Sequence, residues 1–192
     1  AEPWAERTPE IRALASEVAG DETNTWRVVR RPFDRVRAEL TYVYPEPTDR
    51  GAARALARRS GDCGEFAHLF VALARARGIP ARAVTACWFE GSGHQWAEAF
   101  VPPYGWVPVD PAFAHALATD APAFGGAEGI ARLVAQSGLP TRDPAWLCGN
   151  LYPNRLVVFV GTNVEVCPRE RDLARTFAFL QPGGGNALPP AV

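Results

Sequence analysis

The chain has 192 residues, of which 47% are hydrophobic and 21% are charged, and its formal net charge is −1. This length is enough for one domain with a full core, and the composition excludes a disordered or collagen-like chain. The near-neutral charge provides no basic surface for nucleic acid or an anionic membrane, and no apolar run approaches the roughly 20 residues that span a bilayer.

Two residue types are absent from the chain. All 20 basic residues are arginine, which excludes lysine as a catalytic base, as a Schiff-base amine and as a crosslinking donor within the chain. There is also no methionine. We therefore expect a processed or trimmed chain, either cytoplasmic or exported.

The first forty residues predict two helices. Residues 8–10, Thr-Pro-Glu, are a typical helix start, with threonine as the N-cap and proline at the first helical position, and Gly20 ends the helix. A second apolar stripe at helical spacing covers residues 26–40. Pro32 lies inside that stripe, and we expect it to kink or split the helix.

The next forty residues predict a short strand, an Ala- and Arg-rich helix and a buried helix. Residues 40–44 are β-prone, and residues 49–59 are expected to be helical. After the break Gly-Asp-Cys-Gly at residues 61–64, apolar residues return at helical spacing as far as Gly78. Cys63 is therefore predicted to lie in the first turn of a strongly apolar, buried helix.

The period changes to that of strands after residue 80. Strands are predicted over 81–90, 94–101 and 106–110, with a hairpin over 155–166. The intervening residues, 112–150, are rich in Ala, Gly and Pro, and one helix is expected near 128–136.

Helices first and antiparallel strands after them indicate an α+β fold. We expect one domain over residues 1–180 and a flexible C-terminal tail over 181–192, where the sequence is QPGGGNALPPAV from Gln181 onward. No internal repeat is present, and the oligomeric state is not predicted.

Three residues form the pattern that carries chemistry: a Cys at a helix N-terminus, a His that opens a strand and an Asp that ends the next strand. The N–H groups and dipole of the helix stabilise a thiolate at Cys63 and can face an oxyanion. His94 can pair with that thiolate and later protonate a leaving group. Asp110 can fix the tautomer and the orientation of His94.

The register between strands 94–101 and 106–110 decides whether Asp110 reaches His94. In an antiparallel pair the numbers of facing residues add to a constant. An even sum places Asp110 on the face of His94, and a sum of 206 places it opposite Trp96 and diagonal to His94. We predict an even sum, because an odd one sends Asp110 to the other face of the sheet.

Three segments, in order, resemble the transglutaminase-like superfamily: SGDCGEFAHLFVALARARGIPARAV, GHQWAEAFVPPYGWVPVDPAF and GNLYPNRLVVFVGTNVEVCP. The resemblance covers about residues 40–168. The third segment is similar to the stretch that follows the other two in many bacterial members of the superfamily. It implies Cys63 as nucleophile, His94 as base and acid, and Asp110 as the orienting group. It also implies a papain-like α+β fold, in which the Cys helix packs on an antiparallel sheet.

The resemblance further implies acyl transfer through a Cys thioester on a peptide or protein substrate, with no cofactor. Water or an amine then resolves the thioester, and hydrolysis is favoured because nothing recognisable in the sequence builds a second, amine-binding wall. A non-catalytic binding or assembly module that keeps the fold is the alternative. A metal site formed by Cys63, His94 and Cys87 is a third hypothesis, although no CxxC or CxxH spacing indicates structural zinc.

Several side chains have two interpretations. Tyr42, Trp96 and Trp106 are candidates for an oxyanion donor or a cleft wall, and each can instead belong to the core. Glu65 is expected to stabilise the helix N-terminus, with substrate binding as the alternative. Gln95, which stands where the family often has a small residue, is expected to face away from His94 with little effect.

The remaining thiols also have two interpretations. Cys148 and Cys167 either form a disulfide, if the protein is exported, or stay as buried free thiols, which we favour.

Overall fold

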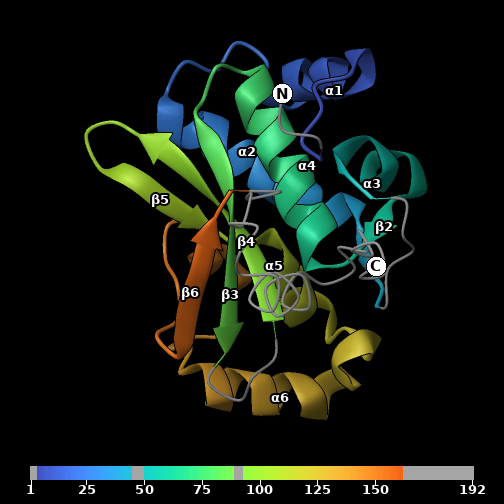
Figure 1. The fold of residues 1–192 in the computed structure, drawn as a ribbon, viewed down its shortest axis with the longest axis vertical. Coiled ribbons are helices and arrows are strands. Elements are labelled where there is room, and N and C mark those ends of the chain that lie inside the picture. The colour runs from blue at the N-terminus through green and yellow to red at the C-terminus, as the bar shows by residue number, and fades with distance from the viewer. Residues whose placement is uncertain (1–3, 45–49, 89–92, 162–192) are drawn as a thin grey trace, which may run out of the picture.

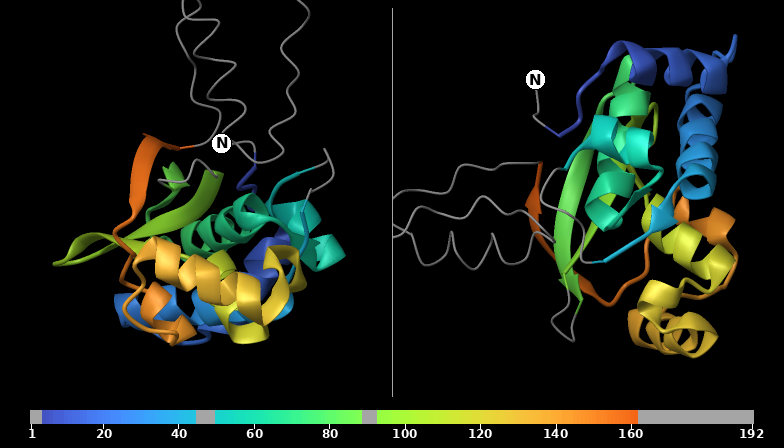
Figure 2. Two further views of the ribbon diagram at one scale, coloured as in Figure 1. Left: turned by 90° about the horizontal axis from the view of Figure 1, so that it is seen from below. Right: turned by 90° about the vertical axis from the view of Figure 1, so that its right-hand side faces the viewer.

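A computed structural model describes residues 4–44, 50–88 and 93–161, and places its helices on one side of a four-stranded sheet (Figures 1 and 2). The helices are α1 (Pro9–Ala19), α2 (Thr25–Glu39), α3 (Ala52–Arg58), α4 (Cys63–Ala76), α5 (Pro111–Thr119) and α6 (Gly126–Ser137), with 3-10 turns η1 (Pro122–Phe124) and η2 (Pro144–Leu147). The strands are β1 (Thr41–Tyr42), β2 (Ser60–Gly61), β3 (Ala81–Trp88), β4 (Gly93–Val101), β5 (Gly105–Val109) and β6 (Arg155–Val160).

Both predicted N-terminal helices are confirmed. The side chain of Thr8 accepts a hydrogen bond from the backbone of Ile11 at 3.3 Å, which caps α1 as expected. Pro32 lies inside α2 but does not split it, contrary to one of the two expected outcomes. Pro32 is buried on the same face as Val29 and Phe33, so packing against the core holds the helix together despite the missing backbone donor.

Helix α4 forms the centre of the molecule. All residues from Cys63 to Ala74 are buried. The helix packs against β3 and β4 on one side and against α1, α2, α3 and α5 on the others. A helix that is apolar on all faces is stable only when it is enclosed in this way. The predicted packing of the Cys helix on an antiparallel sheet is therefore confirmed.

The main sheet has the order β5-β4-β3-β6, and every neighbouring pair is antiparallel. Alanines on the side that faces α4, among them Ala81, Ala97 and Ala99, are buried, and their small side chains let the helix lie close to the strands. Strand β6 confirms the first half of the predicted hairpin. Its second half, residues 164–166, lies outside the described residues.

The helix α5 was not predicted, because residues 112–150 were interpreted as mostly irregular. Its start has the same chemistry as that of α1: Asp110 is the N-cap, accepting from Phe113 N at 2.9 Å, and Pro111 is the first helical residue. The helix expected near 128–136 is confirmed by α6.

None of the helices in the described ranges is long and apolar enough to cross a membrane.

Candidate active site

Cys63 is the first residue of α4, at the place where the chain leaves β2. Asp62 is the N-cap, and its Oδ1 accepts a hydrogen bond from Gly64 N at 2.8 Å. This cap starts the helix directly at the cysteine and leaves the sulfur beside the unpaired N–H groups of the first turn. The Cys63 side chain is buried, with 1% of the residue exposed.

Asp110 reaches His94 through the predicted register. Ala97 faces Val109 across β4 and β5, a pairing whose numbers add to 206. The residue after Val109 is therefore diagonal to His94, and Oδ2 of Asp110 lies 2.7 Å from Nε2 of His94. The even register is thus confirmed, and the structure brings Cys63, His94 and Asp110 together, since His94 also lies close enough to the sulfur to lower the pKa of Cys63.

His94 is held in its charged form by its neighbours. Burial alone would lower the pKa of this imidazole, but the Asp110 carboxylate and the Cys63 sulfur outweigh burial and raise the pKa to about 10. Because Nε2 faces Asp110, Nδ1 is the ring nitrogen that remains for the sulfur. The imidazolium can therefore stand between a carboxylate and a thiolate.

The charge on Cys63 depends on opposing influences. Burial and the nearby Asp62 carboxylate raise the pKa of the thiol, whereas His94 and the backbone N–H of Gln95 lower it. The contribution of Gln95 was missed, because it comes from the backbone and not from the side chain. The Gln95 side chain donates to Thr85 Oγ1 at 2.8 Å, as expected for a residue that faces away from His94, while the Gln95 backbone N–H acts on the Cys63 thiol.

Tyr42 of β1 lies against the cysteine. Its hydroxyl lies close enough to the backbone N–H and the sulfur of Cys63 for both to act on the pKa of Tyr42. Burial and the charges of Cys63 and Asp62 raise the pKa of Tyr42 well above its usual value, so the hydroxyl keeps its proton and remains a donor. Of the three aromatic candidates, Tyr42 is the one that touches the nucleophile candidate.

The other two aromatic candidates have different surroundings. Trp96 is buried, with its ring centroid 6.2 Å from that of His94, and packs with Val84 and Ala86. It supports the histidine from the side. The prediction that Trp106 lines the site is wrong. Trp106 pairs with Phe100, which lies six residues along β4 from His94, or about 20 Å, and this is too far to line the site.

Tyr152 is a neighbour of the site that the sequence did not reveal. Its ring is wholly buried, stands edge-on to Phe113 at 5.1 Å, and lies 6.5 Å from the ring of His94. Its hydroxyl points to Oδ2 of Asp110 at 3.5 Å, a long contact. A lone tyrosine in the loop before β6 gave no signal that could be distinguished from packing.

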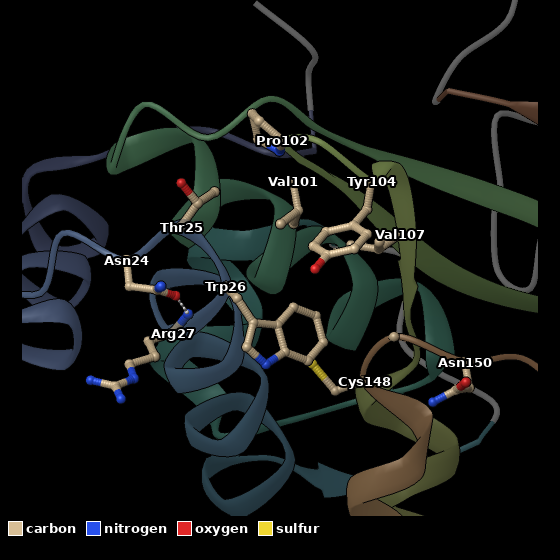
Figure 3. A pocket seen from close by; sticks show the side chains of 11 residues that line it. Asn24, Thr25, Trp26, Arg27, Val101, Pro102, Tyr104, Val107, Cys148 and Asn150 are labelled. Carbon is tan, nitrogen blue, oxygen red and sulfur yellow. Dashed lines mark hydrogen bonds between the residues drawn. The ribbon is translucent and has the colours of Figure 1, made fainter.

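A separate pocket of about 660 Å³ opens elsewhere on the surface (Figure 3). It lies between the start of α2 and the turn that joins β4 and β5, and its lining includes Trp26, Tyr104 and Cys148. None of the three residues brought together at Cys63 lines it. Cys148 is a buried free thiol there, which was the favoured interpretation, and Cys167 lies outside the described residues.

A buried ionic group lies next to Cys63. Arg50, just before α3, places Nη2 at 2.6 Å from Asp62 Oδ1 and at 2.7 Å from Glu65 Oε2. Glu65 also accepts from Gly51 N at 3.4 Å. Substrate binding by Glu65 is therefore not supported, because its carboxyl is enclosed between Arg50 and Gly51.

Replacing Glu65 by glutamine is expected to make stability less dependent on pH. Burial and Asp62 raise the pKa of Glu65 to about 8, so the folded state holds a proton that the unfolded chain releases near its ordinary value. This stabilisation is complete below about pH 4 and is lost as the pH rises through about 8. Glutamine keeps the neutral form, so the variant should gain on the order of 2 kcal/mol relative to wild type between pH 5 and 8.

Urea unfolding at several pH values measures this difference. Glu128 is a matched control, since it occupies the same position in the first turn of α6 as Glu65 does in α4, but is exposed. Glu128→Gln should change stability equally at pH 5 and pH 8. A Glu65→Gln effect that is also independent of pH would contradict a protonated Glu65 in the folded state.

The part of the chain that the structure describes contains no group of three or more His, Cys, Asp or Glu side chains arranged to hold a metal ion. The hypothesis of a metal site at Cys63, His94 and Cys87 therefore has no geometric support within that part. What the site does contain is a thiol, an imidazole and a carboxylate in sequence, which is an arrangement suited to nucleophilic catalysis.

Solved structures with a similar fold include a candidate cysteine protease from Cytophaga hutchinsonii, with 22% identity, a TM-score of 0.52, and coverage of 86% of this chain and 57% of that one. The periplasmic domain of TgpA from Pseudomonas aeruginosa shares 28% identity, with a TM-score of 0.49 and coverage of 58% and 44%. The chain thus spans little more than half the length of the first and less than half of the second. No curated protein matches the chain.

The sequence profile of the Transglutaminase-like superfamily matches residues 12–111, which is more than half of the chain. The matched region runs from α1 to the first residue of α5 and includes Cys63, His94 and Asp110. The fold, with a buried Cys helix on an antiparallel sheet, agrees with that match. The protein therefore belongs to the transglutaminase-like superfamily.

Proposed function

We propose that the protein is an enzyme in which Cys63 attacks a peptide or amide carbonyl and forms a thioester, which water then hydrolyses. The observation that carries this proposal is the position of His94, which lies close enough to the Cys63 sulfur to lower its pKa and lies 2.7 Å from Asp110 on the other side. A nucleophile, a base within reach of it and a group that orients the base are the parts that covalent acyl transfer requires.

In the acylation half-reaction, the Cys63 thiolate, paired with the protonated His94, forms a bond to the carbonyl carbon. The carbonyl oxygen becomes negatively charged. When this intermediate collapses, the carbon–nitrogen bond breaks, and His94 gives its proton to the leaving amine. Asp110 keeps the imidazole in the required tautomer and stabilises its positive charge throughout these steps.

In the second half-reaction, His94 takes a proton from a water molecule, whose oxygen attacks the thioester carbon. The carbon–sulfur bond then breaks, the carboxylic acid leaves, and Cys63 returns to the thiolate that pairs with the protonated His94. A primary amine in place of water would give transamidation by the same steps. The choice between the two depends on what the closed site admits next to the thioester.

Tyr42 and the backbone N–H of Cys63 support the oxyanion in this proposal. Both groups lie beside the sulfur, so an oxyanion that displaces the Tyr42 oxygen from this N–H would accept from the N–H and from the Tyr42 hydroxyl. The raised pKa of Tyr42 keeps the phenol protonated at neutral pH. A donor that meets the charge only as it develops stabilises the transition state more than the bound substrate.

Replacing Tyr42 by phenylalanine is expected to lower kcat about 10²-fold and to leave KM nearly unchanged, because the hydroxyl acts on charge that the substrate does not yet carry. Steady-state kinetics on a peptide that the wild type cleaves measures both constants. Tyr104→Phe is the matched control, since Tyr104 is exposed and lies away from the site. An unchanged kcat in Tyr42→Phe would remove Tyr42 from this role.

The experiment that tests the proposed function is incubation of the protein with a peptide library, with and without a fluorescent primary amine, followed by mass spectrometry. Hydrolysis predicts products that carry a new carboxylate and no amine label. Labelled products would instead indicate transamidation. The absence of any product, together with slow and equal alkylation of all four cysteines by iodoacetamide, would favour a non-catalytic binding or assembly module.

A further inference from the structure

The ionic group of Arg50, Asp62 and Glu65 is enclosed in the protein. The side chains of Arg50, Asp62 and Glu65 are 3%, 0% and 1% exposed. Burying charges is unfavourable unless they are paired, and ordinary stability rarely requires it. The position of the group is informative, because Asp62 and Glu65 lie on the two sides of Cys63 and Gly64 in the same helix turn.

The glycines that flank Asp62 and Cys63 make room for this group. A Cβ on Gly64 would lie 2.8 Å from Arg50 Nη2, and a Cβ on Gly61 would lie 2.3 Å from Glu65 Cβ. Both distances are below those that real Cβ atoms show. The Gly-Asp-Cys-Gly sequence is therefore fitted to Arg50 and Glu65 as well as to the cysteine.

Asp62 has two effects on Cys63 that oppose each other. Its Oδ1 caps the helix by accepting from Gly64 N at 2.8 Å, which fixes the turn that presents the sulfur. Its negative charge, however, disfavours a thiolate next to it, and Asp62 contributes to the raised pKa of Cys63. Asp62 can therefore cap the helix without disfavouring a Cys63 thiolate if a cation beside Asp62 offsets its negative charge.

We propose that Arg50 is a positioning residue for the Cys63 nucleophile, which orients the Asp62 cap and cancels the Asp62 charge beside the sulfur. Nη2 of Arg50 donates to the same oxygen of Asp62 that caps the helix, at 2.6 Å. Arg50 also interacts electrostatically with Cys63 itself. Arg50 therefore places a positive charge on the oxygen that caps the helix, and the Asp62 carboxylate does not act on the sulfur unopposed.

This inference rests on the proposed function in one respect, which is that Cys63 reacts as a thiolate. The other groups that act on the sulfur are His94 from β4, the N–H of Gln95 and Tyr42 from β1. None of these groups is itself removed when Arg50 or Asp62 is changed. A purely structural ion pair would alter stability on mutation, but it would not move the pH dependence of the thiol.

The experiment compares the pH dependence of iodoacetamide alkylation at Cys63, followed by mass spectrometry of the Cys63 peptide, in Arg50→Gln, Asp62→Asn and the double variant. Arg50→Gln should raise the apparent pKa of the thiol and slow its alkylation at pH 7 by about tenfold. Asp62→Asn should shift the profile to lower pH, because asparagine caps a helix as well as aspartate but carries no charge. The double variant should return close to wild type.

The control is Arg12→Gln, which removes an exposed arginine from α1 and should leave the profile unchanged. If Arg50→Gln does not fold, Asp62→Asn decides alone, and an unshifted profile in that variant overturns the inference. The inference is also overturned if Arg50→Gln changes urea unfolding but leaves the profile where it is in the wild type. Failure of the proposed function is distinguishable, because Cys63 in the wild type would then react no faster than Cys87.

Discussion

Replacing Cys63 by alanine is expected to abolish product formation, with a loss of at least about 10⁴-fold in kcat, because no other group can form the thioester. The fold should remain, since alanine fills most of the same buried space at the start of α4 and keeps the Asp62 cap. We expect the free energy of unfolding to change by about 1 kcal/mol or less. Kinetics on a cleaved peptide and urea unfolding measure the two quantities.

Cys87→Ala is the control for this prediction. Cys87 carries a thiol that is partly exposed on β3, and it is not among the groups that act on the Cys63 sulfur. We expect this variant to retain activity and to lose one reactive thiol. Undiminished activity in Cys63→Ala would show that the chemistry takes place elsewhere in the molecule.

Replacing Asp110 by asparagine is expected to lower kcat by about 10²- to 10⁴-fold, because an amide no longer fixes the tautomer of His94 or stabilises its charge. Asparagine is as good an N-cap as aspartate, so Oδ1 can still accept from Phe113 N at the start of α5. The variant therefore separates the role of Asp110 toward His94 from its role in the fold.

The pH dependence gives a second measurement for Asp110→Asn. The Asp110 carboxylate is the main group that raises the pKa of His94 to about 10, so the variant should bring that pKa down. Because the imidazolium then stabilises the thiolate less, iodoacetamide alkylation of Cys63 should require a higher pH than in the wild type. An unchanged profile would contradict the ion pair between His94 and Asp110.

The stability of the wild type should follow the same titration. A histidine whose pKa is raised by folding stabilises the protein fully below its unfolded value, near about 6.5, and loses this contribution as the pH rises through about 10. Asp110→Asn should therefore be destabilised relative to wild type at pH 6 and should approach it at pH 10. Urea unfolding at both values measures the difference.

The order of the elements and the central residues could be predicted from sequence because their signals are local. Caps and prolines act over three or four residues, which is why the start of α1 and the position of Cys63 at the start of α4 were predicted correctly. The same chemistry at Asp110 and Pro111 was present, but it was interpreted as the end of a strand, and α5 was missed. The strand period restricted Asp110 to one of two faces, and the observed register places it beside His94.

Arg50 shows why the rest of the site could not be predicted. In the sequence it precedes a segment rich in arginine, and nothing local distinguishes it from Arg54 or Arg58, which are exposed. It becomes a buried partner of Asp62 only when α3 packs beside α4 and water is excluded. Glu65 is similar, because a glutamate in a first helical turn is ordinarily solvated.

The sequence by itself determined which residues can supply a thiol, an imidazole and a carboxylate, and which elements carry them, because periodicity and capping are properties of neighbouring residues. Only the tertiary structure decided which donors and charges surround them: the Gln95 N–H, the Tyr42 hydroxyl, the Arg50 guanidinium and the distant position of Trp106. These depend on contacts between segments far apart in the chain and on the loss of water between them. No local pattern encodes either of those.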